Sequence, residues 1–271
     1  MALIRIEHVD KAFAARHGSI NIMQDISFDV ADSDFLAIVG PSGCGKSTLL
    51  RLIQGLDHPT RGQIFFRDQP VTGVCARMAM VFQSFALYPW LTVAENVAFG
   101  LEALKWPAER IKSQVERYVS VTGLDGFQEA YPRELSGGMR QRVGLARALA
   151  VEPSVLLMDE PFSALDPLTA EGLREEVLQL WRDPTLPPDA VLLVSHNIEE
   201  AIQLADRVIV LARRPSHVLA DVRVDLPRPR DRKSSAFYDL TDRVYSLITE
   251  GGGPAPPTPV PGASSPPQQA L

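Results

Sequence analysis

Short apolar runs recur along this 271-residue chain, and their spacing predicts a series of strands. In the first third, alternating or continuous apolar positions indicate strands at residues 3–9, 26–30, 35–39, 64–66 and 78–82. Two later runs, Val155–Met158 and Val191–Val194, are apolar at every position, which is typical of parallel strands covered on both faces. A further strand is expected at residues 208–212.

Between these strands, apolar residues recur three and four positions apart, which predicts helices. We expect helices at residues 48–54, 135–150, 168–181 and 198–205, a terminal helix around 237–247, and helical structure within 92–124. Because strands and helices alternate, the chain is expected to be an α/β protein with a mostly parallel sheet and right-handed crossovers. The stretch at about 92–150 interrupts that alternation and is interpreted as a helical insertion.

Residues 251–271 are rich in Pro, Ser and Gln and offer almost nothing to bury, so they are predicted to form a disordered tail. Residues 1–250 are therefore expected to form the folded domain, with the helical insertion inside it.

Composition and charge exclude several classes of protein. An apolar content of 45% and a charged content of 22% are ordinary for a soluble globular chain, and a net charge of −6 argues against a nucleic-acid partner. No apolar run approaches the roughly 18–20 residues of a membrane span, and the charged, alternating N-terminus is unlike a signal peptide. Cys44 and Cys75 show no metal or redox spacing, so we interpret them as free thiols in the cytosol.

The stretch after the third predicted strand has the pattern G-x-x-x-x-G-K-[ST], in the strand–turn–helix context that forms a phosphate cradle. Glycines let successive backbone N–H groups point inward, and the helix start adds partial positive charge. Lys46 is expected to reach the β- and γ-phosphates, and the Ser47 hydroxyl to ligate Mg²⁺. The expected nucleotide contacts are Gly40, Pro41, Ser42, Gly43, Cys44, Gly45, Lys46, Ser47 and Thr48.

Three polar residues follow the two continuous apolar strands. Asp159 ends the first of them and is the expected acidic partner of Mg²⁺, and Glu160 is free to orient the attacking water. His196 stands just past the second strand, where a γ-phosphate would lie. The alternatives are solvated carboxylates at a strand end and a structural histidine.

A Ser136-Gly137-Gly138 turn at the start of a predicted helix is a second anion site. One bound triphosphate is already surrounded by the phosphate loop. The second site is therefore expected to serve a nucleotide held by another copy of the chain.

The motifs together resemble the ATP-binding cassette of ABC transporters over residues 3–250; they are Gly40–Thr48, Gln83, Leu135–Met139, Val155–Glu160, Ser163–Asp166 and His196. The resemblance implies a P-loop NTPase fold: a RecA-like core with a mostly parallel sheet, an N-terminal antiparallel β subdomain and a helical insertion subdomain. It also implies that two copies enclose two ATP molecules head-to-tail, with Ser163 and Asp166 in the dimer interface.

The resemblance further assigns roles to single residues. Gln83 would ligate Mg²⁺ and sense a permease, Glu160 would be the general base, and His196 would contact the γ-phosphate. Phe13 matches an aromatic residue that stacks on adenine, and a core phenylalanine is the alternative for this position.

The segments Phe82–Val93 and Ser195–Ala201 resemble the cassettes of nitrate, sulfonate and taurine importers. This implies that the chain is a peripheral protein at the cytoplasmic face of the inner membrane, driving a permease served by an extracytoplasmic solute-binding protein. Phe85, Tyr88 and Trp90 are expected to be exposed and to contact the permease; packing inside the insertion is the alternative.

Two other classes of protein are alternatives: cassette ATPases that transport nothing, and P-loop kinases or GTPases. Import of an unrelated small organic solute is a further alternative. DNA-repair cassettes insert a long coiled coil where this chain has a small helical region, and translation factors of the family carry two cassettes. A P-loop kinase or GTPase would not need the Ser-Gly-Gly turn, and no guanine-reading Asn-Lys-x-Asp is present.

Overall fold

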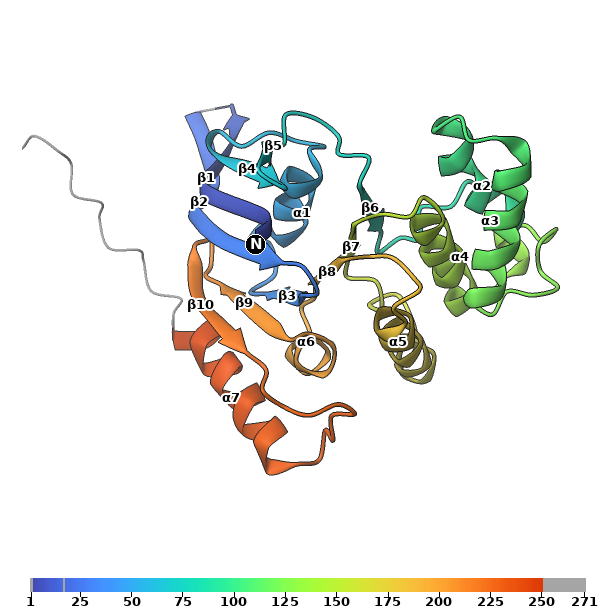
Figure 1. Cartoon of the computed structure of the whole chain (residues 1–271). Helices are drawn as coiled ribbons and strands as arrows, with labels where there is room; N and C mark the ends of the chain where they lie inside the picture. Colours follow the sequence, from blue (N-terminus) through green and yellow to red (C-terminus); the bar gives the residue numbers. More distant parts are fainter. Residues whose placement is uncertain (1, 17, 251–271) are drawn as a thin grey trace, which may run out of the picture.

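The computed structural model describes residues 2–16 and 18–250, and these form two sheets flanked by helices (Figure 1). The first sheet is antiparallel throughout, in the strand order β2-β1-β4-β5. Its strands are β1 (Ala2–Ala15), β2 (Gly18–Ala31), β4 (Arg61–Phe66) and β5 (Gln69–Pro70). This sheet confirms the expected N-terminal antiparallel subdomain.

The second sheet is mostly parallel, in the order β10-β9-β3-β8-β7-β6. Only β10 runs antiparallel to its neighbour. The strands are β3 (Phe35–Val39), β6 (Met78–Val81), β7 (Val155–Asp159), β8 (Ala190–Val194), β9 (Arg207–Leu211) and β10 (Val218–Arg223). The predicted α/β class with a parallel core is thereby confirmed.

Alternate residues of the core strands enter two different hydrophobic clusters. In β3, Phe35, Ala37 and Val39 pack in one cluster, and Leu36 and Ile38 in the other. The first cluster includes residues of the helices α4 (Gly137–Ala150), α5 (Pro167–Arg182), α6 (Ile198–Leu204) and α7 (Ser235–Glu250). The second includes α1 (Lys46–Gln54) and the inner face of the antiparallel sheet. Burial on both faces explains why these strands are continuously apolar.

The helical region consists of α2 (Val93–Ala103), α3 (Ala108–Val121) and α4, which stand together beside the core sheet in Figure 1. Thr92 and Glu95 form a capping box that fixes the start of α2. The expected helical structure within 92–124 consists of the two helices α2 and α3. The extent of the insertion and the division at residue 250 remain predictions.

Sequence patterning missed β5 and β10, and it expected β1 and β2 to be shorter than they are. The outer part of β1 and β2 pairs only within the hairpin, as in the pair Phe13–Ile20, so its residues are largely exposed and carry no clear period. The expected disordered tail at residues 251–271 lies outside the described residues. Within the described part of the chain, no helix combines the length and the apolar character that crossing a bilayer requires.

Candidate functional site

The phosphate loop joins the end of β3 to the start of α1. Gly43 and Gly45 have φ values of +75° and +109°, which glycine adopts without strain. A Cβ on Gly45 would also lie 2.7 Å from Cγ2 of Ile22, and a Cβ on Gly40 would lie 2.8 Å from the carbonyl oxygen of Leu211. The glycines are therefore required both by the path of the loop and by its close packing.

Lys46 is folded back into the loop. Its side-chain nitrogen donates hydrogen bonds to the carbonyl oxygens of Gly40 at 2.9 Å and Pro41 at 3.3 Å, and the residue is 5% exposed. The ammonium thus sits inside the ring of backbone that the glycines create. A phosphate oxygen carries negative charge, so it is a stronger acceptor for this ammonium than either neutral carbonyl oxygen.

A hydrogen bond joins Ser47 to Asp159 at the edge of the parallel sheet. The Ser47 hydroxyl donates to Oδ1 of Asp159 at 2.8 Å, which joins the first turn of α1 to the end of β7. Burial raises the pKa of the Asp159 carboxyl, and the hydrogen bond from Ser47 partly opposes this. A hydroxyl and a carboxylate in contact at a phosphate loop are the hard oxygen ligands that Mg²⁺ prefers, so the residues present fit that ion.

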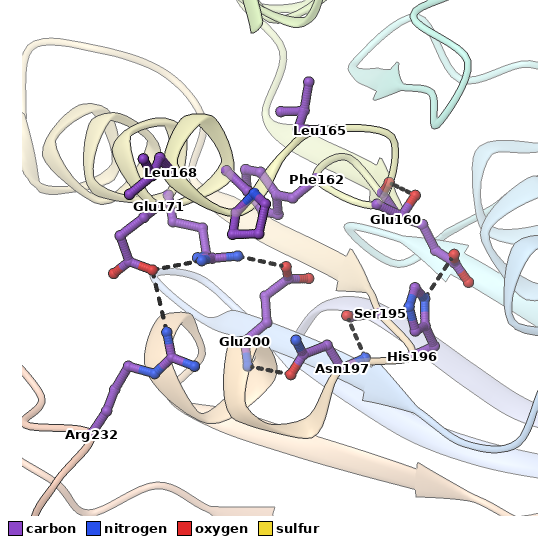
Figure 2. Close-up of a pocket in the computed structure, with 14 residues that line it drawn as sticks. Glu160, Phe162, Leu165, Leu168, Glu171, Ser195, His196, Asn197, Glu200 and Arg232 are labelled. Carbon is purple, nitrogen blue, oxygen red and sulfur yellow. Dashed lines mark hydrogen bonds and ion pairs between the residues drawn. The ribbon is translucent and has the colours of Figure 1, made fainter. Parts of the chain in front are cut away.

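Glu160 and His196 lie together at the ends of neighbouring strands (Figure 2). Nδ1 of His196 is 3.0 Å from Oε2 of Glu160. Glu160 has a φ of +47°, unusual for a non-glycine residue, and its backbone N–H donates to the carbonyl oxygen of Val194 at 3.0 Å. This backbone conformation directs the Glu160 carboxylate toward the phosphate loop, where Glu160 lines an open cleft together with Lys46 and Ser47. Asp159, one residue earlier, points to Ser47 instead.

An open cleft passes from the phosphate loop toward the antiparallel sheet. Its lining includes Phe13, Ser42, Lys46, Thr48 and Glu160. Phe13 is 43% exposed and is therefore not a core residue. Its ring lies 4.8 Å from the Lys11 ammonium nitrogen. An exposed ring at the mouth of a phosphate cradle is placed where an adenine could stack.

Sequence reasoning missed Arg214, which lies between β9 and β10 and lines the same cleft. Its Nη2 donates to the carbonyl oxygen of Gly43 at 2.7 Å. The pair Arg213-Arg214 in a turn was the only signal in the sequence. Arg214 brings a second cation to the cleft that Lys46 occupies.

The Ser-Gly-Gly turn does not line this cleft. Ser136 caps α4 by accepting a hydrogen bond from the N–H of Met139 at 3.2 Å. The turn packs instead against the start of α5: a Cβ on Gly138 would lie 2.4 Å from Cγ2 of Thr169, whose N–H bonds to Asp166 at 3.1 Å. Ser136, Ser163 and Asp166 are all exposed. Within a single chain, the phosphate loop and the Ser-Gly-Gly turn therefore do not form one site.

Gln83 is exposed just beyond β6, and its side chain makes no hydrogen bond within the described residues. Val81 pairs with Met158 in the parallel register of β6 and β7, so Gln83 leaves the sheet level with Glu160. The structure thus places Gln83 at the same edge as Asp159, without contact between them.

The loop from Phe85 to Trp90 is held rigidly on the helical region. Asn96 accepts from the N–H of Tyr88 at 2.9 Å and donates to the carbonyl oxygens of Tyr88, Leu91 and Thr92. Phe85 and Tyr88 are partly buried, contrary to expectation, because the Phe85 ring lies 5.3 Å from the guanidinium of Arg140 and Tyr88 packs 4.4 Å from Phe99. Only Trp90, at 69%, is as exposed as expected.

Comparison with known proteins agrees with this geometry. The family model described as ABC transporter matches residues 23–163. The aliphatic sulfonates import ATP-binding protein SsuB of Bacillus cereus is 39% identical, over 92% of this chain and 97% of its own length. The nitrate import ATP-binding protein NrtD of Synechocystis is 41% identical, over 90% and 94%.

A solved dimeric ATP-binding cassette, bound to ADP and phosphate in a post-hydrolysis state, is similar in structure. It has a TM-score of 0.72 and 29% identity, over 82% of this chain and 98% of that one. The expected resemblance to ATP-binding cassettes of ABC transporters is confirmed by these matches.

The Asp159→Asn variant tests the site by its pH dependence. Because folding raises the pKa of Asp159, this group stabilises the fold at low pH and loses that contribution as pH rises through its folded pKa. An uncharged Asn should therefore raise the midpoint of thermal unfolding of the nucleotide-free protein by about 2–4 °C at pH 7.5. The gain should shrink as the pH is lowered, and stabilisation by ATP with Mg²⁺ should be lost.

Calorimetry with and without the nucleotide checks this expectation. Asp239→Asn is the matched control, since Asp239 is exposed and its side chain has no partner among the described residues. A stability change that is the same at every pH would contradict the assignment.

Proposed function

The chain belongs to the ABC transporter family and is an ATP-binding cassette that hydrolyses ATP, and on this premise we propose that two copies close head-to-tail around two ATP molecules to drive solute import. The observation that carries the proposal is the separation of the phosphate loop from the Ser136–Gly138 turn within one chain.

Binding of ATP rests on the cleft between the phosphate loop and Phe13. Backbone N–H groups of the loop and the start of α1 surround the phosphates, and Lys46 moves from the carbonyls of Gly40 and Pro41 to the β- and γ-phosphates. Phe13 stacks on the adenine. Arg214, already on the loop at Gly43, adds positive charge beside the phosphates.

Hydrolysis transfers the γ-phosphoryl group to water. Ser47 and Asp159, with Gln83 at the neighbouring strand end, would hold Mg²⁺, which would neutralise charge on the phosphate oxygens. Glu160 orients the attacking water and accepts its proton as the new P–O bond forms and the bond to the β-phosphate oxygen breaks. His196, held 3.0 Å from Glu160, donates to the γ-phosphate. The products are ADP and phosphate.

The second copy completes each site. The turn at Ser136–Gly138, exposed at Ser136 and half-buried at Gly137, offers a hydroxyl, backbone N–H groups and the start of a 14-residue helix to an anion that its own chain does not hold. Ser163 and Asp166 lie beside it on the same exposed surface and would meet the partner chain. The similar solved cassettes are dimeric, which supports this arrangement.

The transported solute is a small one, such as nitrate, an aliphatic sulfonate or taurine, delivered by an extracytoplasmic solute-binding protein. The relatives at about 40% identity support this class without naming one member of it. The cassette would bind a permease from the cytoplasmic face of the inner membrane, as a peripheral subunit. Trp90, Phe99 and Leu104 are large apolar residues exposed on the helical region and its loop, which is where a permease helix would dock.

Glu160→Gln removes the base and keeps the volume of the side chain. Hydrolysis should fall at least about 100-fold because the water is no longer activated, while ATP still binds and dimers accumulate. Phosphate release and light scattering with size exclusion measure the two effects. Glu116→Gln, at an exposed position without contacts in the described chain, is the control. Hydrolysis at the wild-type rate would contradict the role of Glu160.

A mixing experiment tests whether the site is shared between copies. Lys46→Ala and Ser136→Glu should each abolish hydrolysis alone. In a mixed dimer, the Ser136→Glu chain supplies an intact phosphate loop and the Lys46→Ala chain supplies an intact Ser-Gly-Gly turn. Random pairing makes half the dimers mixed with one good site each, so an equal mixture should recover about a quarter of the wild-type rate. A mixture as inactive as its parents would exclude sharing.

Trp90→Glu tests the permease surface. A buried charge in an apolar interface is costly, so coupling of the cassette to its membrane partner should fall about tenfold or more. The ATPase rate of the isolated chain should stay within about twofold. Transport by the membrane complex in vesicles and ATPase of the isolated chain are measured together. Val74→Glu, at another exposed apolar residue, is the control; equal loss in both variants would count against the interface.

A further inference from the structure

Three arginines lie in the segment Leu226–Lys233, which connects β10 to α7 and is called the arginine segment below. They are Arg228, Arg230 and Arg232. All three reach back to α6, the short helix that begins two residues after His196. The proposed function assigns no role to them.

Arg230 and Arg228 hold the C-terminal end of α6. The Nη1 atom of Arg230 donates to the carbonyl oxygens of Ile202 at 2.7 Å and Ala205 at 2.6 Å, and Arg228 donates to that of Leu204. These are the carbonyls that a helix end leaves without partners, and a cation is favoured there by the helix dipole. The Arg230 side chain is 1% exposed, and burial lowers its pKa to about 10, so it stays charged near neutral pH.

Arg232 holds the other end of α6. It forms ion pairs with Glu199, in the first turn of α6, and with Glu171 of α5 at 3.3 Å. The pairing continues through Arg174, which contacts Glu171 at 2.6 Å and the buried Glu200 at 3.3 Å. Glu171, Glu200 and Arg232 are labelled in Figure 2. Positive and negative groups alternate along the chain of contacts, which runs from the arginine segment to the first turn of α6.

The position of α6 sets the position of His196. Asn197 joins them: its side chain accepts from the N–H of Glu200 at 3.1 Å, and its own N–H donates to Oγ of Ser195 at 2.9 Å. The His196 side chain is 57% exposed, and among the described residues its only hydrogen-bond partner is Glu160. The orientation of the imidazole therefore depends on the position of the backbone at residues 195–197, which α6 fixes.

A seven-residue helix has little stability of its own, because isolated helices shorter than about 12–15 residues are marginal in water. The buried face of α6 packs in the first hydrophobic cluster, and the arginine segment adds polar contacts at both ends of the helix. We infer that the arginine segment, through Arg232 at the start of α6 and Arg230 at its end, positions His196 against the γ-phosphate during hydrolysis. The inference rests on the role that the proposed function gives to His196.

The Arg232→Gln variant tests this, because Arg232 is partly exposed and its loss should not prevent folding. We expect kcat for ATP hydrolysis to fall about three- to tenfold, since small displacements of a catalytic group are costly. KM for ATP should stay within about twofold, because Arg232 lies outside the nucleotide cleft. Lys233→Gln is the matched control: it removes the same charge one residue later, from an exposed side chain without contacts in the described chain.

A double-mutant cycle separates positioning from general stability. In a His196→Ala background, Arg232→Gln should cause no further loss of kcat, because the group that it acts through is gone. Glu199→Gln, which removes the partner of Arg232 on α6, should mimic Arg232→Gln, and Arg232→Lys should restore part of the rate. Thermal unfolding of each variant verifies that it is folded.

Two results would overturn the inference alone: a wild-type kcat in Arg232→Gln beside a defective His196→Ala, or an equal loss from Arg232→Gln with and without His196. A His196→Ala protein that hydrolyses ATP at the wild-type rate would overturn the role of His196, and the inference with it. Failure of the inference and failure of the proposed function therefore give different results.

Discussion

The parallel register of β3, β8 and β7 is the constraint on which the site depends. Val194 of β8 lies opposite Ile38 on one side and Asp159 on the other, so the three strands end level with one another. The phosphate loop, His196 and Glu160 leave the sheet from these ends and meet at one edge, as ligand-binding groups do in open α/β sheets. A shift of one residue in any pairing would move its side chains to the other face of the sheet.

The same edge of the sheet contains two charged groups, Asp159 and Lys46, whose placement destabilises the nucleotide-free fold. Asp159 is partly buried, with only a hydroxyl as its hydrogen-bond partner among the described residues, and Lys46 is folded against backbone carbonyls without a carboxylate. Both arrangements lower the free energy of unfolding of the nucleotide-free chain, because a charge removed from water is destabilising unless an opposite charge lies beside it. In the proposed function, a triphosphate with Mg²⁺ would provide that opposite charge for both groups at once. The strain at Glu160, with its positive φ, belongs to the same compromise between stability and catalysis.

Local sequence patterns predicted the strands whose ends carry the catalytic groups. They missed features that depend on contacts between segments far apart in the sequence. The runs at 155–158 and 191–194 are apolar because both sheet faces are covered, so the sequence alone revealed strands β7 and β8 and the groups at their ends. Strand β10 is an edge strand with mixed exposure and gives no such signal. Arg214 reaches the phosphate loop only because β9 pairs with β3, a neighbour about 170 residues away in sequence that periodicity cannot reveal.

Two structural routes leave the nucleotide edge, one on each side of β7. On the β6 side, Gln83 leads into a loop that Asn96 fixes to α2, and the exposed Trp90 lies at its end. On the β8 side, His196 leads into α6, which the arginine segment contacts at both ends. Each route is an element anchored by buried polar contacts. Under the proposed function, a small change at the γ-phosphate would therefore be carried outward along both routes to two distant surfaces, as a displacement of each element.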